Sequence, residues 1–243
     1  MLLYYVRHGD PIYTPDSLTP LGERQAEAVC RRLAAFGIDK VFTSTSTRAK
    51  MTAKPLCDMM KLTPTELDFA NEGHAWAEMT TKLSDGRPCW LFQAKSTCRL
   101  MVSPEVFALG DRWFDHPEFA GRGYDRGIAR IHEGTDAFLA SLGYEHDREK
   151  RMYRAVRPSK EKVAFFAHEG FGGLFVSSLL DIPYSQFAPY YTMMHSGLTV
   201  IDFPDEEDYV IPHIRTFAND GHLYEDRLPY AYDFDQHYFN FHE

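Results

Sequence analysis

An arginine, a histidine and a glycine follow the first apolar segment of the chain. Arg7, His8 and Gly9 come directly after residues 2–6, which read as a short buried strand. A guanidinium group binds a phosphate through two parallel hydrogen bonds, and a neutral imidazole is a nucleophile that accepts a phosphoryl group. Gly9 has no Cβ and lets the backbone pass close to a ligand. A core strand followed by a surface turn would also account for these three residues. The choice between the two interpretations therefore depends on the rest of the sequence.

Two more strand patterns end in residues of similar chemistry. Residues 41–43 precede the segment from Ser44 to Arg48, and a strand pattern over residues 162–167, apolar from Val163 onward, precedes His168. In a parallel sheet these strand ends meet at one carboxyl edge, where open α/β sheets bind ligands. The sequence therefore predicts that two histidines and two arginines gather beside helix amino ends, as a dianion site requires.

Helical patterns separate these strands. Thr19 is a good N-cap, Pro20 suits the first helical position, and Gly37 is a natural stop. Further helices are expected after Ser46, over residues 126–142 and from His168 to Leu180, with late strands at 198–203 and 209–211. This alternation predicts an α/β fold with a mostly parallel central sheet between two helical layers.

The middle of the chain breaks the alternation. Residues 73–124 are rich in aromatic and turn residues, including Trp76, Trp113 and Phe114. We interpret this segment as a cap inserted into a single domain of residues 1–243 that covers the ligand edge, because an unpatterned loop of that length is unusual. The charged residues 145–151 are expected to form a solvated connector.

Composition excludes several classes of protein. The chain has 243 residues and a net charge of −9, which disfavours nucleic acid or an anionic membrane as a partner. Arg7 interrupts the first apolar run too early for a signal peptide. Four cysteines without CxxC spacing argue against a zinc site and a disulfide framework. We expect a cytoplasmic protein, and the sequence leaves a homo-oligomer open.

Together these motifs resemble the histidine phosphatase superfamily, in the branch of the phosphoglycerate mutases. The resemblance rests on four stretches of the chain, with residues 73–124 outside it: Arg7-His8-Gly9, residues 18–26, residues 43–49 with Arg48, and Ala167-His168-Glu169-Gly170. It implies the three-layer α/β/α fold of that branch.

The resemblance also implies roles for the residues at the strand ends. His8 would be the nucleophile that becomes phosphohistidine, and Arg7, Arg48 and His168 would bind the phosphate, with no metal and no cofactor. Neighbouring cations should lower the pKa values of both histidines.

The family further uses a carboxylic acid that protonates the leaving oxygen. Counting from the turn at residues 62–64 reaches Glu72, while Glu66 and Asp68 remain competitors. We favour Glu72, whose burial would raise its pKa and keep it protonated.

Other polar residues are weaker candidates. Thr14 and Ser17 would donate to the phosphate, although turn hydroxyls usually bond to their own backbone. Residues 195–197 and 219–223 resemble late family segments near the pocket, and structural turns are the stronger interpretation. The aromatic and acidic tail, residues 230–241, is expected to pack against the domain or a partner subunit.

The leading hypothesis is a metal-independent phosphatase that hydrolyses a small phosphomonoester. A phosphoglycerate mutase-type phosphotransferase is the enzyme alternative; the short loop between His8 and Thr19 lacks the asparagine typical of mutases. A catalytically idle phosphate-binding module is the alternative from another class. A metallohydrolase ranks last because no HxxxH or similar spacing is present.

Overall fold

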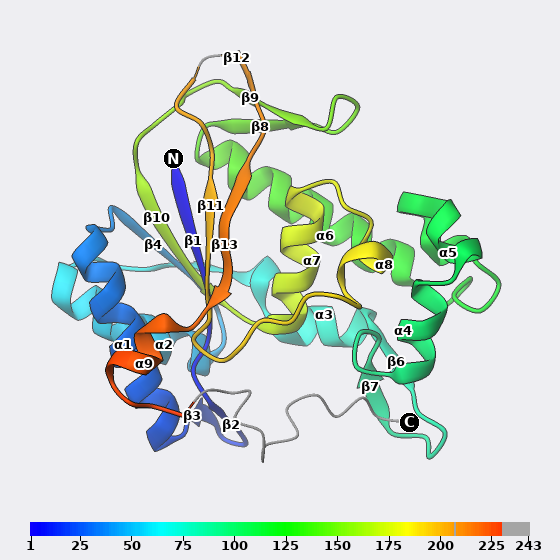
Figure 1. The fold of residues 1–243 in the computed structure, drawn as a ribbon, viewed down its shortest axis with the longest axis horizontal. Coiled ribbons are helices and arrows are strands. Elements are labelled where there is room, and N and C mark those ends of the chain that lie inside the picture. Colours follow the sequence, from blue (N-terminus) through cyan, green and yellow to red (C-terminus); the bar gives the residue numbers. More distant parts are fainter. Residues whose placement is uncertain (207, 230–243) are drawn as a thin grey trace.

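The computed structural model describes residues 1–206 and 208–229. Its centre is a mixed six-stranded sheet in the order β13-β11-β1-β10-β4-β5 (Figure 1). Strands β1, β10, β4 and β5 run parallel, and β11 and β13 are antiparallel additions at one side. The strands are β1 Leu2–Arg7, β4 Lys40–Ser44, β5 Thr65–Leu67, β10 Lys162–Ala167, β11 Leu198–Asp202 and β13 His213–Asn219.

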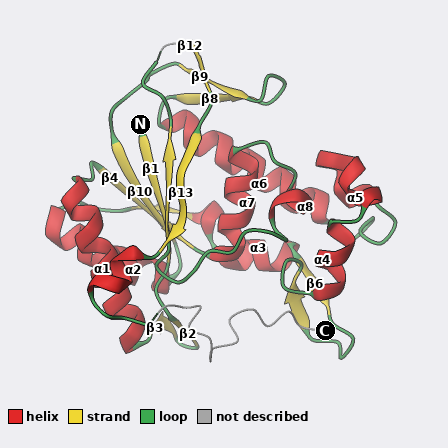
Figure 2. Cartoon of the chain, in the orientation of Figure 1, coloured by secondary structure: helices red, strands yellow, loops and turns green. Residues whose placement is uncertain are grey.

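Helices cover both faces of this sheet (Figure 2). Helices α1, α2 and α9 lie on one side, and α6 and α7 lie on the other (Figure 1). The bounds are α1 Pro20–Phe36, α2 Thr47–Met60, α6 Tyr124–Ser141, α7 Glu169–Leu179 and α9 Gly221–Glu225. The three-layer α/β/α fold expected from the sequence is confirmed.

Strand β1 shows why both faces need a helical layer. Its side chains alternate between two buried faces, as the two-residue period of a strand requires. Tyr4 and Val6 pack in the cluster that includes Leu33 of α1, whereas Leu3 and Tyr5 pack in the cluster under α6 and α7.

The first helix begins and ends where the sequence predicts. The Thr19 side chain accepts a hydrogen bond from the Gly22 amide at 3.0 Å, and Pro20 occupies the first helical turn. Gly37 closes the helix with a φ of 75°, a left-handed conformation that glycine adopts without strain.

The expected cap begins one residue inside a helix and ends at the start of α6. It consists of short elements, of which α3 packs against α6 and α7, and α4 and α5 pack against α8 Tyr184–Phe187 (Figure 1). They are α3 Glu72–Glu78, β6 Thr80–Lys82, β7 Pro88–Trp90, α4 Lys95–Met101, α5 Pro104–Leu109 and the 3-10 helix η2 Gly110–Asp115. Trp113 is 1% exposed and stacks on Tyr124, so this indole anchors the segment to the core.

The prediction for residues 145–151 was wrong. Strands β8 Tyr144–Asp147 and β9 Met152–Ala155 form a hairpin here, and β12 Asp208–Val210 adds a third strand. Two of the charged side chains are not fully solvated, because His146 and Arg148 pair with Asp136 and Asp181.

The remaining short elements lie in the connections between these layers. They are β2 Pro11–Tyr13, β3 Asp16–Leu18, the 3-10 helix η1 Asp68–Ala70 and α8 Tyr184–Phe187. No helix in the described ranges is long and apolar enough to cross a membrane. The tail segment 230–241 lies outside the described residues.

Candidate functional site

Two histidines that are far apart in the sequence meet at the carboxyl edge of the sheet. Strands β1 and β10 pair in parallel with Arg7 opposite Ala167, and the His8 amide donates to the Ala167 carbonyl at 2.9 Å. The next residues along both strands, His8 and His168, therefore bring their ring centroids to 5.1 Å.

The His8 ring is held in one orientation. Its Nδ1 lies 2.7 Å from the carbonyl oxygen of Gly9, which only accepts hydrogen bonds, so Nδ1 carries the proton. Nε2 is then the basic nitrogen, and it accepts from Nε of Arg48 at 3.2 Å. The lone pair of Nε2 consequently faces a cation, which is the orientation that an attacking nitrogen needs beside an anion.

Arg48 connects three strand ends. Its Nη2 lies 3.1 Å from Nδ1 of His168, and its Nη1 donates to Asp16 at 2.8 Å. Arg48 lies in the first turn of α2, which places its guanidinium group near the amino end of that helix. The helix dipole and the guanidinium group both favour an anion at this point.

Arg7 lies on the other side of His8 and is buried. Its Nη1 forms an ion pair with Glu169 at 2.8 Å and also donates to the Met193 carbonyl. Its Nη2 lies 2.8 Å from Nε2 of His195. These contacts fix the guanidinium group at the end of β1.

His168 is fully buried at the start of α7. Because Nδ1 accepts from Arg48, Nε2 carries the proton and faces the hydroxyl groups of Ser44 at 2.8 Å and Ser46 at 3.1 Å. Ser46 is the N-cap residue of α2, but its side chain makes no capping bond and points to His168 instead.

Burial and positive charge keep the three clustered histidines neutral. Burial is the largest cause that lowers the pKa of His8, followed by Arg7 and Arg48. The pKa of His168 is lowered by burial, His8 and both arginines, and that of His195 by burial, Arg7 and His8. The direction expected from the neighbouring arginines is present for His8 and His168, and burial contributes more than charge.

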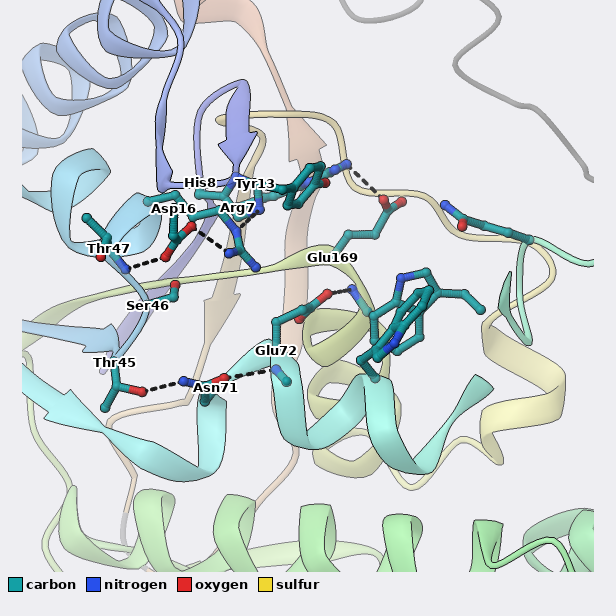
Figure 3. A pocket seen from close by; sticks show the side chains of 16 residues that line it. Arg7, His8, Tyr13, Asp16, Thr45, Ser46, Thr47, Asn71, Glu72 and Glu169 are labelled. Carbon is teal, nitrogen blue, oxygen red and sulfur yellow. Dashed lines mark hydrogen bonds and ion pairs between the residues drawn. The ribbon is translucent and has the colours of Figure 1, made fainter. Parts of the chain in front are cut away.

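Glu72 lies at the start of α3, and its carboxyl group faces the amino end of α7 (Figure 3). Oε1 accepts from the Gly170 amide at 3.0 Å, and Oε2 accepts from the Phe171 amide at 3.1 Å. Burial nevertheless raises the pKa of Glu72 to about 7. A carboxyl group with this pKa is suited to give up and take back a proton near neutral pH.

The two competing acids lie elsewhere. Glu66 is in β5 and pairs with Lys50 at 3.2 Å, with about half of its side chain exposed. Asp68 is exposed and lies 3.1 Å from Nε2 of His74. Neither contacts the cavity that Glu72 lines.

A cavity of about 750 Å³ opens beside these groups (Figure 3). Arg7, His8, Arg48 and Glu72 line it, whereas the buried His168 does not line it but contacts the lining residues Arg48 and Ser46. The volume is typical of pockets that bind whole metabolites and is much larger than a phosphate needs.

The weaker candidates lie outside the cavity. Thr14 is exposed, and the Ser17 hydroxyl donates to the Pro15 carbonyl, as expected of a turn residue. His195 packs 5.7 Å from the His8 ring but does not line the cavity. In the 219–223 segment, Nε2 of His222 lies 2.9 Å from the hydroxyl oxygen of Ser196, the residue that follows His195.

The structure gives a different reason for the glycine at position 9 from the predicted one. It does not line the cavity, and a Cβ at this position would collide with the Gly22 carbonyl of α1. The close approach is therefore between the loop after β1 and helix α1, which lets the Gly9 carbonyl fix the His8 ring.

Sequence reasoning missed Tyr13, Asp16 and Glu169, which also line the cavity. Asp16 accepts hydrogen bonds from Arg48 and from the Thr47 amide at 2.7 Å. Glu169 follows His168 directly, and that position was a usable signal. In residues 1–206 and 208–229, no three His, Cys, Asp or Glu side chains are arranged to hold a metal ion.

Comparison with known proteins agrees with this geometry. Residues 3–96 match the family model of the histidine phosphatase superfamily, branch 1, which confirms the resemblance read from the motifs. A search of the curated proteins found no match.

Two similar solved structures illustrate the fold. One is mycobacterial glucosyl-3-phosphoglycerate phosphatase, at 17% identity and a TM-score of 0.55, covering 89% of this chain and 98% of that one. The other is phosphoserine phosphatase from Entamoeba histolytica, at 15% identity and a TM-score of 0.57, covering 91% of this chain and 98% of that one. At this identity the likeness establishes a shared fold.

Proposed function

We propose that this chain, with its match to the histidine phosphatase superfamily, is a phosphoric monoester hydrolase acting on a small phosphorylated metabolite. The observation that carries the proposal is the state of His8. Its Nδ1 proton is bound to the Gly9 carbonyl, its Nε2 lone pair faces Arg48, and its pKa is lowered by burial and two arginines. The similar solved structures named above are phosphatases, which agrees with this assignment.

In the first step, Nε2 of His8 attacks phosphorus, and the bond between phosphorus and the leaving oxygen breaks. Glu72 gives its proton to that oxygen, so the alcohol leaves neutral. The guanidinium groups of Arg7 and Arg48 stabilise the charge on the phosphoryl oxygens. His168 positions Arg48 from behind through its Nδ1.

In the second step, water attacks phosphorus, and the bond to Nε2 breaks. The Glu72 carboxylate takes a proton from the water, which restores the acid for the next turnover. A raised pKa serves both steps, because the same group must donate and then accept. No step requires a cofactor or a metal ion.

We favour hydrolysis over transfer to a second hydroxyl group. Asp16, at the start of β3, accepts from Arg48 at 2.8 Å, and the segment between His8 and Thr19 lacks the asparagine typical of mutases. The buried, polarised Glu72 argues against an idle binding module.

We further propose a single domain in which residues 73–124 act as a specificity cap, since Trp76, Trp90 and Gln93 of this segment form part of the cavity wall. A cytoplasmic location is supported by the four free cysteines.

The direct test is release of inorganic phosphate by purified protein from a panel of phosphomonoesters, with and without EDTA. We expect release that needs no bisphosphoglycerate and that EDTA leaves unchanged. The His8→Ala variant should lose turnover while keeping its fold, because His8 lies at a strand end. Phosphate release by that variant near the parent rate would remove His8 as the nucleophile.

A further inference from the structure

The cavity has a second part, beyond the phosphate-binding residues, that is built from aromatic rings. Trp76 and Trp90 meet edge to face with ring centroids 5.0 Å apart, and Phe92 stacks behind Trp90 at 5.6 Å. Trp76 is 38% exposed although it lines the cavity, and Tyr13 lines it with 68% exposure. We define Trp76 and Trp90 as the aromatic wall, whereas the Tyr13 ring lies over the phosphate-binding Arg48, with its centroid 5.4 Å from Cζ.

Two local features place the aromatic wall beside the carboxyl group of Glu72. Trp76 follows Glu72 by four residues on α3, so the two side chains lie on the same face one helical turn apart. Gly170 brings Trp90 to the same place, since a Cβ there would lie 2.6 Å from the indole and 2.8 Å from Oε1 of Glu72. A leaving group protonated by Glu72 therefore extends along these indoles.

The charged residues that line the cavity limit which leaving groups it accepts. Among the described lining residues, the cations are Arg7 and Arg48. Arg7 contacts His195 and pairs with Glu169, and Arg48 contacts His8 and pairs with Asp16. The other charged lining groups are the carboxyl groups of Asp16, Glu72 and Glu169. Within the described part of the lining, a second anionic group on the substrate would therefore meet no cation that is not already paired with a carboxylate.

We propose that the aromatic wall selects phosphomonoesters whose leaving group carries a planar ring and no second anionic group. This inference rests on the proposed phosphatase function. Indole faces bind flat rings by stacking, and such contacts tolerate many ring types. The ring would lie beside Trp76 when the leaving oxygen is at the Glu72 carboxyl group, because these two side chains are neighbours one turn apart on α3.

A matched pair of substrates tests the ring. Adenosine 5′-monophosphate and ribose 5-phosphate share the same primary leaving alcohol and differ in the base. We expect kcat/KM at least about tenfold higher for the nucleotide, as one stacked base provides. In Trp76→Ala the ratio should fall close to one through a loss on the nucleotide, and Trp76→Phe should keep most of the preference.

The outcomes separate the two proposals. Equal kcat/KM for both esters in the parent protein, or an equal loss on both in Trp76→Ala, would overturn the ring-binding role and leave the phosphatase intact. Failure to hydrolyse any ester, p-nitrophenyl phosphate included, would contradict the phosphatase instead. Calorimetry with the His8→Ala variant compares the affinities of the two esters without turnover, so it tests the aromatic wall in either case.

A second pair tests the charge. O-phosphoserine differs from O-phosphoethanolamine by one carboxylate. We expect the kcat/KM for phosphoserine to be the lower of the two. A preference for phosphoserine would contradict the proposed exclusion of a second anionic group.

Discussion

Two clusters of this molecule place histidine and arginine side chains beside different partners. The sheet-edge cluster, His8, His168, Arg7 and Arg48, surrounds its histidines with guanidinium groups. The hairpin cluster lies beside β8 and contains His146, Arg148, Asp136 and Asp181. There the imidazole lies between two carboxylates, at 2.9 Å from Asp136 and 2.8 Å from Asp181.

The protonation states follow from these partners. Burial and the arginines lower the pKa of His8, so its ring stays neutral and keeps a lone pair. Burial also opposes the charged form of His146, but its hydrogen bonds to Asp136 and Asp181 outweigh burial and raise the pKa. A histidine poised for an anion is thus distinguished from a structural histidine by which charges touch its ring.

Removing one arginine from each cluster gives the largest expected difference in activity. Arg48→Ala should lower kcat/KM by about 10²–10³-fold, because it removes the cation that stabilises the transferring phosphoryl group. Steady-state kinetics on one ester gives this value, with Arg148→Ala as the matched control. A loss of similar size in Arg148→Ala, with its fold intact, would break the distinction between the clusters.

The acid of the sheet-edge site is tested by leaving-group dependence. Glu72→Gln should slow turnover of alkyl phosphates by about 10²-fold and that of p-nitrophenyl phosphate much less, because nitrophenolate leaves without a proton. In the parent protein, turnover should fall as pH rises through the pKa of Glu72, about 7, where the acid loses its proton.

Glu72→Gln should also flatten that limb of the pH profile. Glu66→Gln is the matched control, since its side chain is exposed and pairs with Lys50. Equal losses on both ester types would mean that Glu72 does not protonate the leaving group.

Stability is expected to depend on the hairpin cluster. Arg148→Ala removes ion pairs to Asp136 at 2.8 Å and Asp181 at 3.0 Å. The two part-buried carboxylates then lack this cation. We expect a loss of about 1–3 kcal/mol in the free energy of unfolding, measured with urea. Arg154→Ala, which breaks an exposed pair with Glu145, should change it by less than about 0.5 kcal/mol.

The smallest effect concerns pH. Because the folded pKa of His146 is raised, its stabilisation is fully present below the ordinary value of 6.5 and is lost as pH rises through the folded pKa. His146→Gln should remove that decline on the alkaline side, as urea unfolding at a series of pH values would reveal. An unchanged decline in the variant would assign it to another group.

The sequence predicted the sheet-edge cluster because a general rule of parallel sheets places it. His8, Arg48 and His168 each follow a strand, and strand ends share an edge, so no knowledge of packing was needed. Glu72 was harder, because its position depends on α3 packing against the amino end of α7.

Residues that depend on long-range packing escaped prediction. Asp16 reaches Arg48 only because the β2–β3 hairpin folds back over α2. The strands at 144–155 escaped because alternating charges resemble a solvated loop until their partners, Asp136 and Asp181, are known. Local sequence patterns predict whether a segment is a helix or a strand, but they do not show which charged side chains pair in the folded protein.

The central claim is that Nε2 of His8 receives the phosphoryl group. Acid quenching of the protein during turnover destroys phosphohistidine, so the protein is instead quenched in alkali after mixing with a labelled phosphomonoester, and the labelled peptide is sequenced. We expect alkali-stable, acid-labile label on His8 that is absent from His8→Ala and retained in His168→Ala. Label on another residue, or turnover with no labelled enzyme at any time, would contradict the account.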